Sequence, residues 1–484
     1  MRDFLNGRFT RLPLLNPKVL RLVAVLALAV TLSCQQKQEL RQQTTGHTYY
    51  ASPGDNLASK IRVLRPGDTL VLNDGTYTSL RLDPNNGTAI HGTATAPIAI
   101  KAANDGKAIF DPHGSTQPIF VNGSSFVTIQ GFVARNSVDN VVYLFGGGGY
   151  PDDHITLRRI TAYNAAPGNN IIFENAYGNS HILIEDCAGW GVGRYIFDNY
   201  HVSYTTLRRT FAYWESEPNF AAPRAGYAVY GSHDIVLENV ISRHVLPPSS
   251  VTDDPQEYAA LYRTTNDTLN YPTYNTTLRG VMFYDNWDGM YGNGSSGLHT
   301  QITNSYFESP NAFSTTAGTS TNDKGNGINW WNAYDGTITN SVFANSTIGF
   351  ARHNSSAIIT INNSVFLNNG TAITNATSQS YNDFYGNGSN GVSLASTDTT
   401  VNPGYETTTY GRGAYLMLPP ALQGKGQNGA DIGANILYEY QDGVLTNQPL
   451  WPWPMENRIM AEKGISVTWA SNGGIWETLN GVYP

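Results

Sequence analysis

The segments TTLRRTFAYW (205–214), IVLENVISRH (235–244) and TTLRGVMFYD (276–285) follow one pattern. Each places an apolar anchor before a polar or turn residue, returns to apolar residues, and ends on an aromatic or charged pair. Nine segments share the anchor, at Ile129, Leu157, Ile184, Leu207, Leu237, Leu278, Ile302, Ile338 and Ile361. Neighbouring anchors are between about 23 and 41 residues apart, which indicates one structural coil per repeat with loops of variable length.

The repeats also contain a second short apolar run, such as IIFEN (171–175), YIFDN (195–199) and AALYR (259–263). Two positions after the anchor, Gly and Asn are frequent, and both tolerate the left-handed backbone of a bend. Stacked Asn side chains can also hydrogen-bond to one another along such a column. These features predict an all-β fold, a single-stranded right-handed parallel β-helix over residues 49–400. A propeller needs a steadier period, and a β-sandwich would not repeat the same columns.

Stacking turns an alignment column into a physical ladder, because parallel strands lie about 4.8 Å apart. Opposite charges on neighbouring strands attract modestly, whereas like charges there are unfavourable. The column after the anchor alternates in sign, reading Gln130, Arg158, Glu185, Arg208, Glu238 and Arg279. We interpret it as an exposed ion ladder that fixes the register, and therefore not as a site of chemistry.

Composition narrows the class of protein. The chain has 484 residues, a net charge of −8 and only 14% charged residues, and it is rich in Asn, Ser, Thr, Gly and Tyr. Poor helix formers at this density disfavour an all-helical fold. The acidic balance argues against nucleic acid as the main partner. We expect a monomer.

The N-terminus has the pattern of an export signal. Basic residues precede the apolar run LVAVLALAVTL (22–32), and Ser33-Cys34 follows. This predicts a signal peptide over 1–33 of lipoprotein type, with Cys34 acylated, and a tether over 34–48; plain secretion and an uncleaved anchor are the alternatives. The protein is then an exported bacterial protein at the outer membrane or cell surface, which touches the membrane only through its lipid. Cys187 has no partner for a disulfide, shares a column with apolar residues, and is expected to be buried and inert.

The segments RPGDTLVLNDGTYTSLRL, APIAIKAANDGKAIFD and FVTIQGFVARNS resemble the N-terminal coils of β-helical polysaccharide lyases, chiefly the chondroitinase B and alginate lyase group. GADIGAN (429–435) is similar to endings of bacterial β-helix proteins. The resemblance implies an acidic polysaccharide as the partner. In that group the central coils carry a catalytic lysine, whereas residues 170–300 of this chain contain no Lys, so no catalytic residue transfers by motif.

Aromatic and charged residues gather in the central coils and could contact a sugar polymer, since rings stack on pyranose faces and Arg pairs with carboxylates. One column that we expect to be exposed ends each repeat, reading Arg135, Tyr163, Trp190, Tyr213, Arg243 and Tyr284. It serves either as a sugar platform or as structural stacking. The candidate substrate contacts are Trp190, Tyr213, Trp214, Arg224 and Tyr230.

A second expected column follows the other apolar run and reads Glu174, Asp198, Gly231 and Arg263. Two carboxylates on adjacent coils can share a calcium ion, or, without a cation, one should have a raised pKa; the alternative is that each caps a bend. β-Elimination also needs a group that neutralises the uronate, a base and an acid. For these roles the candidates are Arg243, His244, Tyr262 and Arg263.

Beyond residue 400 the repeat fades, and LWPWPMENRI (450–459) cannot continue regular coils. Because a solenoid end needs a cover, residues 401–484 are interpreted as a capping segment folded back along the helix. WPWP is then either packed or a sugar-binding patch. The leading hypothesis for function is cleavage of an acidic polysaccharide by β-elimination. The alternatives are a non-catalytic polysaccharide-binding or adhesin-like surface lipoprotein, a purely architectural protein, and a glycoside hydrolase using Glu215 and Glu217.

Overall fold

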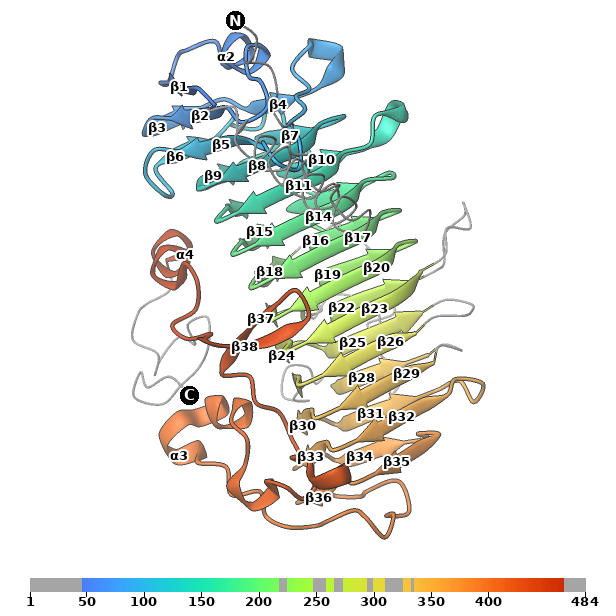
Figure 1. Ribbon diagram of the computed structural model, residues 1–484. Helices are drawn as coiled ribbons and strands as arrows, with labels where there is room; N and C mark the ends of the chain where they lie inside the picture. The colour runs from blue at the N-terminus through green and yellow to red at the C-terminus, as the bar shows by residue number, and fades with distance from the viewer. Residues whose placement is uncertain are drawn as a thin grey trace, which may run out of the picture.

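The computed structural model describes residues 46–216, 224–246, 258–264, 273–293, 299–309, 325–331 and 335–464. Three long parallel sheets run the length of the molecule, and each coil contributes one strand to each sheet in the order A, B, C (Figure 1). The predicted fold, a single-stranded right-handed parallel β-helix, is confirmed. Among the described residues, no helix has the length and apolar character needed to cross a membrane.

Sheet A carries the anchors, and its thirteen strands are β1 (Thr48–Ala51), β2 (Thr69–Leu72), β5 (Ile98–Ala102), β8 (Ser125–Gln130), β11 (Asp153–Arg158), β14 (Ser180–Glu185), β17 (Ser203–Arg208), β20 (His233–Glu238), β23 (Tyr274–Arg279), β26 (Thr300–Thr303), β29 (Gly336–Thr339), β32 (Ile359–Asn362) and β35 (Ser378–Ser380). Sheet B comprises the twelve strands β3 (Gly75–Tyr77), β6 (Ala108–Phe110), β9 (Phe132–Arg135), β12 (Thr161–Tyr163), β15 (Ala188–Val192), β18 (Phe211–Ser216), β21 (Ile241–Arg243), β24 (Met282–Tyr284), β27 (Tyr306–Glu308), β30 (Val342–Ala344), β33 (Val365–Leu367) and β36 (Asp383–Tyr385).

Sheet C comprises the eleven strands β4 (Leu80–Leu82), β7 (Ile119–Val121), β10 (Val142–Phe145), β13 (Phe173–Ala176), β16 (Tyr195–Tyr200), β19 (Arg224–Tyr230), β22 (Tyr258–Thr264), β25 (Asp288–Asn293), β28 (Asn326–Trp330), β31 (Ile348–Arg352) and β34 (Thr371–Thr374). Outside the coils lie the antiparallel hairpin β37 (Tyr438–Gln441) and β38 (Val444–Pro449), the helices α2 (Leu57–Arg62), α3 (Thr407–Tyr410) and α4 (Glu456–Lys463), and the 3-10 turns η1 (Pro84–Asn86), η2 (Gly147–Gly149), η5 (Gly411–Leu416), η6 (Pro420–Leu422) and η7 (Gln427–Gly429).

The anchor alignment is confirmed in full, because the nine anchors are register partners on neighbouring strands of sheet A from Ile129 to Ile361. All nine side chains are buried inside the helix. A stack of phenylalanines fills the interior behind sheet B, with ring centres 4.9–5.7 Å apart, at Phe283, Phe307, Phe343, Phe366 and Phe384. Repeating one apolar residue per coil therefore builds a continuous core.

The alternating charge column also aligns as predicted, with Arg158, Glu185, Arg208, Glu238 and Arg279 paired in register. Successive members form ion pairs of 2.7–3.2 Å. The expected exposure is wrong for the centre of the ladder, where Arg208 is 2% and Glu238 1% exposed. The β37–β38 hairpin covers it, since Arg208 pairs with Asp442 and the backbone N–H of Gly443 donates to Glu238 at 2.7 Å.

The bend two positions after the anchor adopts the left-handed conformation expected for Asn, with φ of 48–52° at Asn239, Asn304, Asn340 and Asn363. In place of the expected contacts between stacked Asn residues, these side chains hydrogen-bond the backbone of the C-terminal segment. Asn304 donates to the carbonyl of Asn435 at 2.7 Å, and Asn340 donates to that of Asp431 at 2.7 Å. The asparagines therefore hold a covering segment in place.

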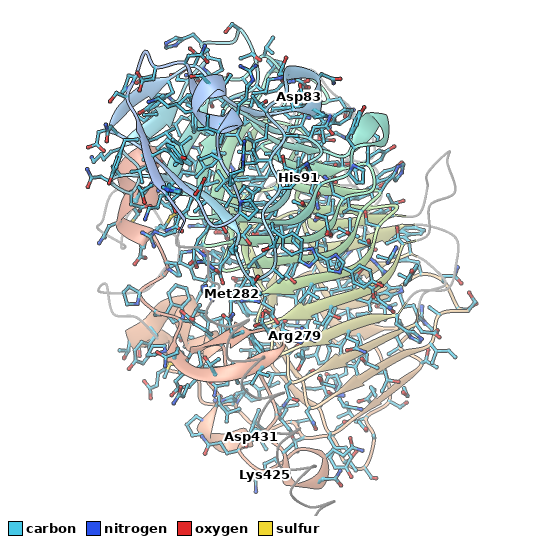
Figure 2. All side chains as sticks on the ribbon, turned by 45° about the horizontal axis from the view of Figure 1, so that its top comes forward. Asp83, His91, Arg279, Met282, Lys425 and Asp431 are labelled. Carbon is cyan, nitrogen blue, oxygen red and sulfur yellow. The ribbon has the colours of Figure 1, made fainter. Side chains whose placement is uncertain are left out.

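Residues 401–464 run back along the flank of the helix beside sheets A and B (Figure 1). Arg458 of α4 donates to the carbonyl of Phe132 in β9 at 2.6 Å. This strand is eight strands of sheet B away from β33, the strand of the Asn363 coil where the segment begins its return. Met282 belongs to the apolar cluster between this segment and sheet B (Figure 2). Trp451 and Trp453 lie in the same cluster at 8% and 2% exposure, so WPWP is packed.

Cys187 is 1% exposed, and burial raises its pKa, as expected for an inert structural thiol. Its Sγ faces the carbonyl of Glu185 at 3.3 Å. The predicted signal peptide, the acylated Cys34 and most of the tether lie outside the described residues, as does Glu217.

Candidate functional site

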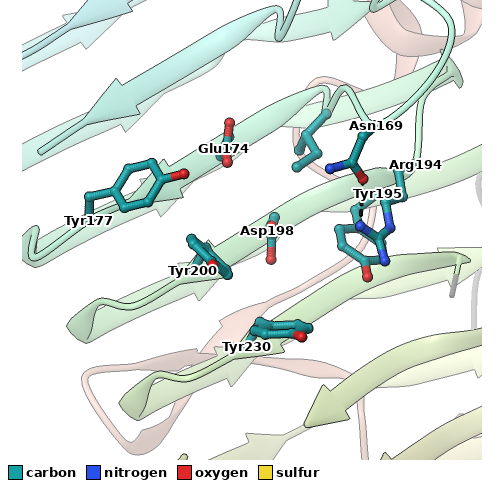
Figure 3. Close-up of a pocket in the computed structure, with 9 residues that line it drawn as sticks. Asn169, Glu174, Tyr177, Arg194, Tyr195, Asp198, Tyr200 and Tyr230 are labelled. Atoms are coloured by element: carbon teal, nitrogen blue, oxygen red, sulfur yellow. Dashed lines mark hydrogen bonds between the residues drawn. The ribbon is translucent and has the colours of Figure 1, made fainter. Parts of the chain in front are cut away.

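A pocket of about 220 Å³ opens on the outer face of sheet C, over β13, β16 and β19 (Figure 3). Its walls carry two carboxyl groups, one arginine and four tyrosines, and it is lined by Asn169, Ile171, Glu174, Tyr177, Arg194, Tyr195, Asp198, Tyr200 and Tyr230. We refer to it as the carboxyl pocket. Its position in the middle third of sheet C places it over the coils in which the sequence concentrates charge and aromatic rings.

The two carboxyl groups come from adjacent coils. Glu174 and Asp198 are register partners on β13 and β16, and both side chains project into the pocket (Figure 3). The same outward column continues through Arg81, Phe120 and Tyr143 on the preceding coils. Parallel strands lie about 4.8 Å apart, so two acidic residues in one column are necessarily close. The predicted pairing of Glu174 with Asp198 is therefore present.

Burial sets the charge of this pair. Glu174 is 9% and Asp198 4% exposed. Burial, with the negative charges of Asp198 and Asp139, raises the pKa of Glu174 well above its usual range. Burial also raises the pKa of Asp198 to about 7, against the opposing effects of Arg194 and the backbone N–H of Asn199. Without a cation the pair therefore keeps at least one proton near neutral pH.

Hydrogen bonding leaves one oxygen of the pair unoccupied. Asn140 donates its amide to Oε2 of Glu174. The described residues offer no hydrogen-bond partner to Oδ1 of Asp198 or to the buried hydroxyl of Tyr195. Unpaired polar atoms are unfavourable in a protein interior, and they mark places where a ligand or water can bind. Both atoms belong to residues that line the carboxyl pocket.

Arg194 forms the wall at one end of the pocket, where its Nη1 donates to Oδ1 of Asn169 at 2.5 Å (Figure 3). Its guanidinium lies over the ring of Tyr195, 4.9 Å from the ring centre. At the opposite end, Tyr177, Tyr200 and Tyr230 form a row with ring centres 5.3 Å apart. The pocket therefore combines acidic groups at its centre, a cation at one end and rings at the other.

The prediction that Gly231 and Arg263 share a column with Glu174 and Asp198 is wrong, because the column passes through other residues of β19 and β22. In the structure Asp198 aligns with Ala228 and then Tyr262. A one-residue shift sends a side chain to the other face of a strand. Arg263 accordingly points inward, is 0% exposed, and donates to the hydroxyl of Thr300 across the interior at 2.5 Å. Tyr262 faces outward but is 4% exposed, with its ring stacked on that of Tyr195 at 6.3 Å.

The structure separates Arg243 and His244 from the carboxyl pocket, because they lie at the end of the sheet B strand β21. Arg243 pairs with Asp285 at 2.7 Å and lies over the ring of Tyr284. His244 stacks on Tyr213, and its Nδ1 is 3.0 Å from the carbonyl oxygen of Trp214. The four residues predicted to perform β-elimination are therefore not brought together.

The column that ends each repeat aligns as predicted from Arg135 to Tyr284. Its expected exposure is wrong, because the C-terminal segment covers it: Trp190 is 4% and Tyr284 0% exposed. Tyr213 is half-buried, with Nζ of Lys463 4.0 Å from its ring centre. This burial fits the alternative of structural stacking, with Tyr163 and Trp190 parallel at 5.0 Å.

Trp214 and Arg224 are also buried, at 1% and 0% exposure, so neither presents a surface to a polymer. The indole N–H of Trp214 donates to the carbonyl of Gly193 at 2.8 Å. Glu215 pairs with Lys463 of α4. Of the predicted substrate contacts, only Tyr230 lines the carboxyl pocket.

Sequence reasoning missed the pocket residues Asn169, Tyr177, Arg194, Tyr195 and Tyr200. The signal was available in part, since Arg194 directly precedes the run YIFDN (195–199), which begins with Tyr195. Tyr200 lies two positions after Asp198 and therefore on the same face of the strand. Asn169 was not accessible to this reasoning, because it lies in a loop before β13 and its contact with Arg194 depends on the loop's path.

No family model matches this chain, and no curated protein matches its sequence. Among solved structures, the chain is similar to the pectate lyase Pel9A, with 14% identity over 76% of this chain and 86% of that one and a TM-score of 0.43. An alginate lyase from Paenibacillus sp. str. FPU-7 has 12% identity over 65% and 93% of the two chains, with a TM-score of 0.38.

A mannuronic acid specific polysaccharide family 6 lyase enzyme from human gut microbiota has 10% identity over 70% and 86%, with a TM-score of 0.42. At such identities and scores the similarity does not identify the reaction or the substrate of this chain.

Proposed function

We propose that this protein binds and cleaves an acidic polysaccharide at the carboxyl pocket. The observation that carries the proposal is the buried pair Glu174–Asp198 on adjacent strands, in a pocket that also holds Arg194 and a row of tyrosines. A pair of titratable groups whose environment shifts their pKa values into the neutral range or above is typical of sites of proton transfer.

The ends of the pocket favour an acidic sugar chain as the ligand. The guanidinium of Arg194 suits the carboxylate of a uronate, since Arg forms paired charge-assisted hydrogen bonds with carboxylates. The rings of Tyr177, Tyr200 and Tyr230 suit the apolar faces of pyranose units. Burial raises the pKa of Glu174 well above its usual range, which favours the uncharged form and limits repulsion of an anionic ligand.

The chemistry that these groups support is β-elimination. Arg194 neutralises the uronate carboxylate, which makes the proton at C5 more acidic. Asp198, with a pKa of about 7, accepts that proton, because a base works best when its pKa lies near the working pH. Glu174 holds a proton that it can donate to the leaving oxygen. The pKa of Tyr177 is raised by burial and by Glu174 and Asp198, which makes its hydroxyl a donor and not a base.

The same two carboxylates also fit calcium, which prefers oxygen ligands. Glu174 and Asp198 would hold the ion, and the unpaired Oδ1 of Asp198 is a free ligand atom in the described structure. When bound, the ion would supply the positive charge that neutralises a substrate carboxylate. If the pair transfers protons, cleavage needs no calcium. If the pair binds a cation, cleavage requires calcium.

A second candidate function is binding of polysaccharide without cleavage. It is favoured by the absence of histidine among the described residues that line the pocket, and by the position of His244, whose ring stacks on Tyr213 beside another sheet. This candidate fits an adhesin-like surface protein. Because this candidate uses the same pocket, it also predicts that the protein binds the polymer, but it predicts no cleavage product.

The test is incubation with alginate, chondroitin, pectin and ulvan while recording the absorbance of the unsaturated uronate that β-elimination creates, with calcium and with a chelator. We expect a signal with one polymer, and its loss in Asp198→Asn and Glu174→Gln but not in Asp74→Asn, which changes an exposed carboxyl on another coil. Activity in the chelator assigns the pair to proton transfer, and a calcium requirement assigns it to cation binding. Retention of a polymer without any cleavage product supports the second candidate. If the protein neither retains nor cleaves any of the polymers, both candidates are contradicted.

Export and acylation of Cys34 remain part of the proposal, since a polymer-degrading protein must meet its substrate outside the cell. Expression in a bacterial host with a labelled fatty acid tests this. We expect label in the wild type and none in Cys34→Ser. Label in neither protein contradicts lipidation and leaves simple secretion.

A further inference from the structure

A second polar cluster lies on the outer face of sheet A, on a different sheet from the carboxyl pocket. His154 and His181 occupy equivalent places on β11 and β14, and the carboxylate of Asp153 lies within hydrogen-bond distance of both rings. Oδ2 of Asp153 is 2.7 Å from Nδ1 of His154, and its Oδ1 is 2.9 Å from Nδ1 of His181. One carboxylate therefore meets the same nitrogen of two imidazoles on neighbouring coils.

The repeat itself brings the two histidines together. Both residues have a φ of 54°. At the same bend of the flanking coils, Phe126 and Tyr204 have similar φ values of 52° and 51°. The bend sends each ring outward into one stack, in which His154 lies 4.3 Å from Phe126 and 4.5 Å from His181, and His181 lies 5.1 Å from Tyr204. The flanking rings fix the place of both imidazoles, which is the preorganisation that a ligand site needs.

The ligand atoms are close enough for one ion. One nitrogen from each imidazole and one carboxylate oxygen lie within 4.8 Å of one another. Two ligands bound at about 2.0–2.1 Å in tetrahedral geometry lie roughly 3.3 Å apart, so the 2.7 and 2.9 Å contacts need to open by only about half an ångström. The two histidine side chains are 43% and 48% exposed, which permits the small rotation that turns both nitrogens toward an ion.

The hydrogen bonding of the cluster also suits a cation. A metal ion at Nδ1 would move each imidazole proton to the exposed Nε2, so no buried proton is stranded. Ser180 donates its hydroxyl to Asp153 at 2.8 Å and orients the carboxylate from behind, as outer residues of metal sites do.

We propose that Asp153, His154 and His181 form a binding site for a divalent transition-metal ion such as Zn²⁺. Imidazole ligands favour zinc, copper, nickel and cobalt over calcium, whose sites use oxygen. The site is therefore chemically distinct from the calcium site proposed at Glu174 and Asp198. It links two successive coils of sheet A, and it stands whether or not the protein cleaves a polysaccharide.

The chain offers a matched control in the same ring stack. His233 on β20 also faces a neighbouring carboxylate, with Nδ1 2.8 Å from Oδ2 of Asp234. Its stacking neighbour is Tyr274, at 4.4 Å, instead of a second histidine. Replacement of His233, whose side chain is 26% exposed, therefore removes one carboxylate-bound imidazole without touching the three proposed ligands.

The test is calorimetric titration of the full chain with ZnCl₂, together with the visible absorption of bound Co²⁺, which reports nitrogen ligation. We expect one saturable site, weakened at least ten-fold in His154→Ala and in His181→Ala, with Asp153→Asn also weakened. His233→Ala and the double variant Glu174→Gln/Asp198→Asn should keep the wild-type isotherm. Circular dichroism checks that the variants are folded. Absence of saturable binding, or binding that survives both histidine substitutions, overturns the proposal.

Discussion

Two columns of charged side chains run along this β-helix, and they differ in the order of their signs. On sheet A, Arg158 to Arg279 alternate in sign, and each charge meets an opposite one on the next coil. On sheet C, Glu174 and Asp198 repeat the same sign on adjacent coils. An alternating column neutralises itself, whereas a like-charged pair needs a proton or a cation from outside.

The two columns also differ in what covers them and in the direction of their pKa shifts. The C-terminal segment covers the alternating column, and Arg208, Arg209 and Arg158 together lower the pKa of Glu185 against the effect of its burial. The like-charged pair lies in an open pocket with raised pKa values. In a solenoid, the order of signs along a column thus separates charges that hold the fold from charges available to a ligand.

The largest expected effect comes from breaking the alternating column at its buried centre. Arg208→Ala leaves Glu185 and Glu238 buried with like charge, and we expect it to lower the free energy of unfolding by about 3–5 kcal/mol. Arg158→Ala, at the 40% exposed end of the same column, should cost less than about 1 kcal/mol. Guanidinium unfolding followed by circular dichroism measures both. Equal effects at the two positions would contradict the role assigned to burial.

The like-charged pair should make stability depend on pH in the opposite sense from a salt bridge. The pKa of Asp198 is about 7 in the folded protein against 3.8 for the free group, so the folded state holds the proton more tightly. The contribution of Asp198 to stability is therefore highest below pH 4, falls as pH rises from about 4 to 7, and is flat above that. Asp198→Asn should remove up to about 4 kcal/mol of this decline. Thermal unfolding at pH 5 and 8, with Asp74→Asn as control, checks it; identical pH profiles for wild type and Asp198→Asn would refute the shift.

The covering segment can be loosened at the asparagines that hold it. Asn304 donates to and accepts from the backbone of Asn435, at 2.7 and 2.5 Å. Asn304→Ala should cost about 1–3 kcal/mol and increase hydrogen exchange in residues 427–441. Asn85→Ala, at an exposed 3-10 turn, should change stability by less than about 0.5 kcal/mol. Unchanged exchange in the segment would show that these bonds do not hold it.

The smallest expected effect tests whether a polymer binds to the row of tyrosines in the carboxyl pocket or to the covered aromatic column of sheet B. Tyr200→Ala should weaken retention on an acidic polymer column by roughly three- to ten-fold, since one ring–sugar contact contributes about 0.5–1.5 kcal/mol. Tyr213→Ala should leave retention unchanged, because Lys463 and His244 cover its ring. The reverse result would restore the covered column as the binding surface.

The parts predicted correctly from the sequence are those fixed by the spacing of the coils. One residue per coil in a column determined the register of all nine anchors, the ion ladder and the pair Glu174–Asp198. The predicted column left the true register at Gly231, where the structure aligns Asp198 with Ala228, and one coil later Arg263 falls on the other face of the strand from the aligned Tyr262.

The exposure of the columns could not be predicted in the same way. Covering of Trp190 and Arg208 depends on residues 411–464, which are more than 200 positions away in the chain and have no repeat to align. The histidine cluster escaped notice for another reason. Asp153-His154 and Ser180-His181 occupy the bend before the anchor, a position that was not compared between coils.

The most direct test is a crystal structure of the protein with an acidic oligosaccharide of the polymer that it retains. The account predicts that the sugar lies on sheet C, with a uronate carboxylate beside Arg194 and a ring against Tyr177, Tyr200 or Tyr230, and with its reacting bond next to Glu174 and Asp198. A sugar bound along the flank of sheets A and B, or bound elsewhere on sheet C without contact to that pair, would contradict it.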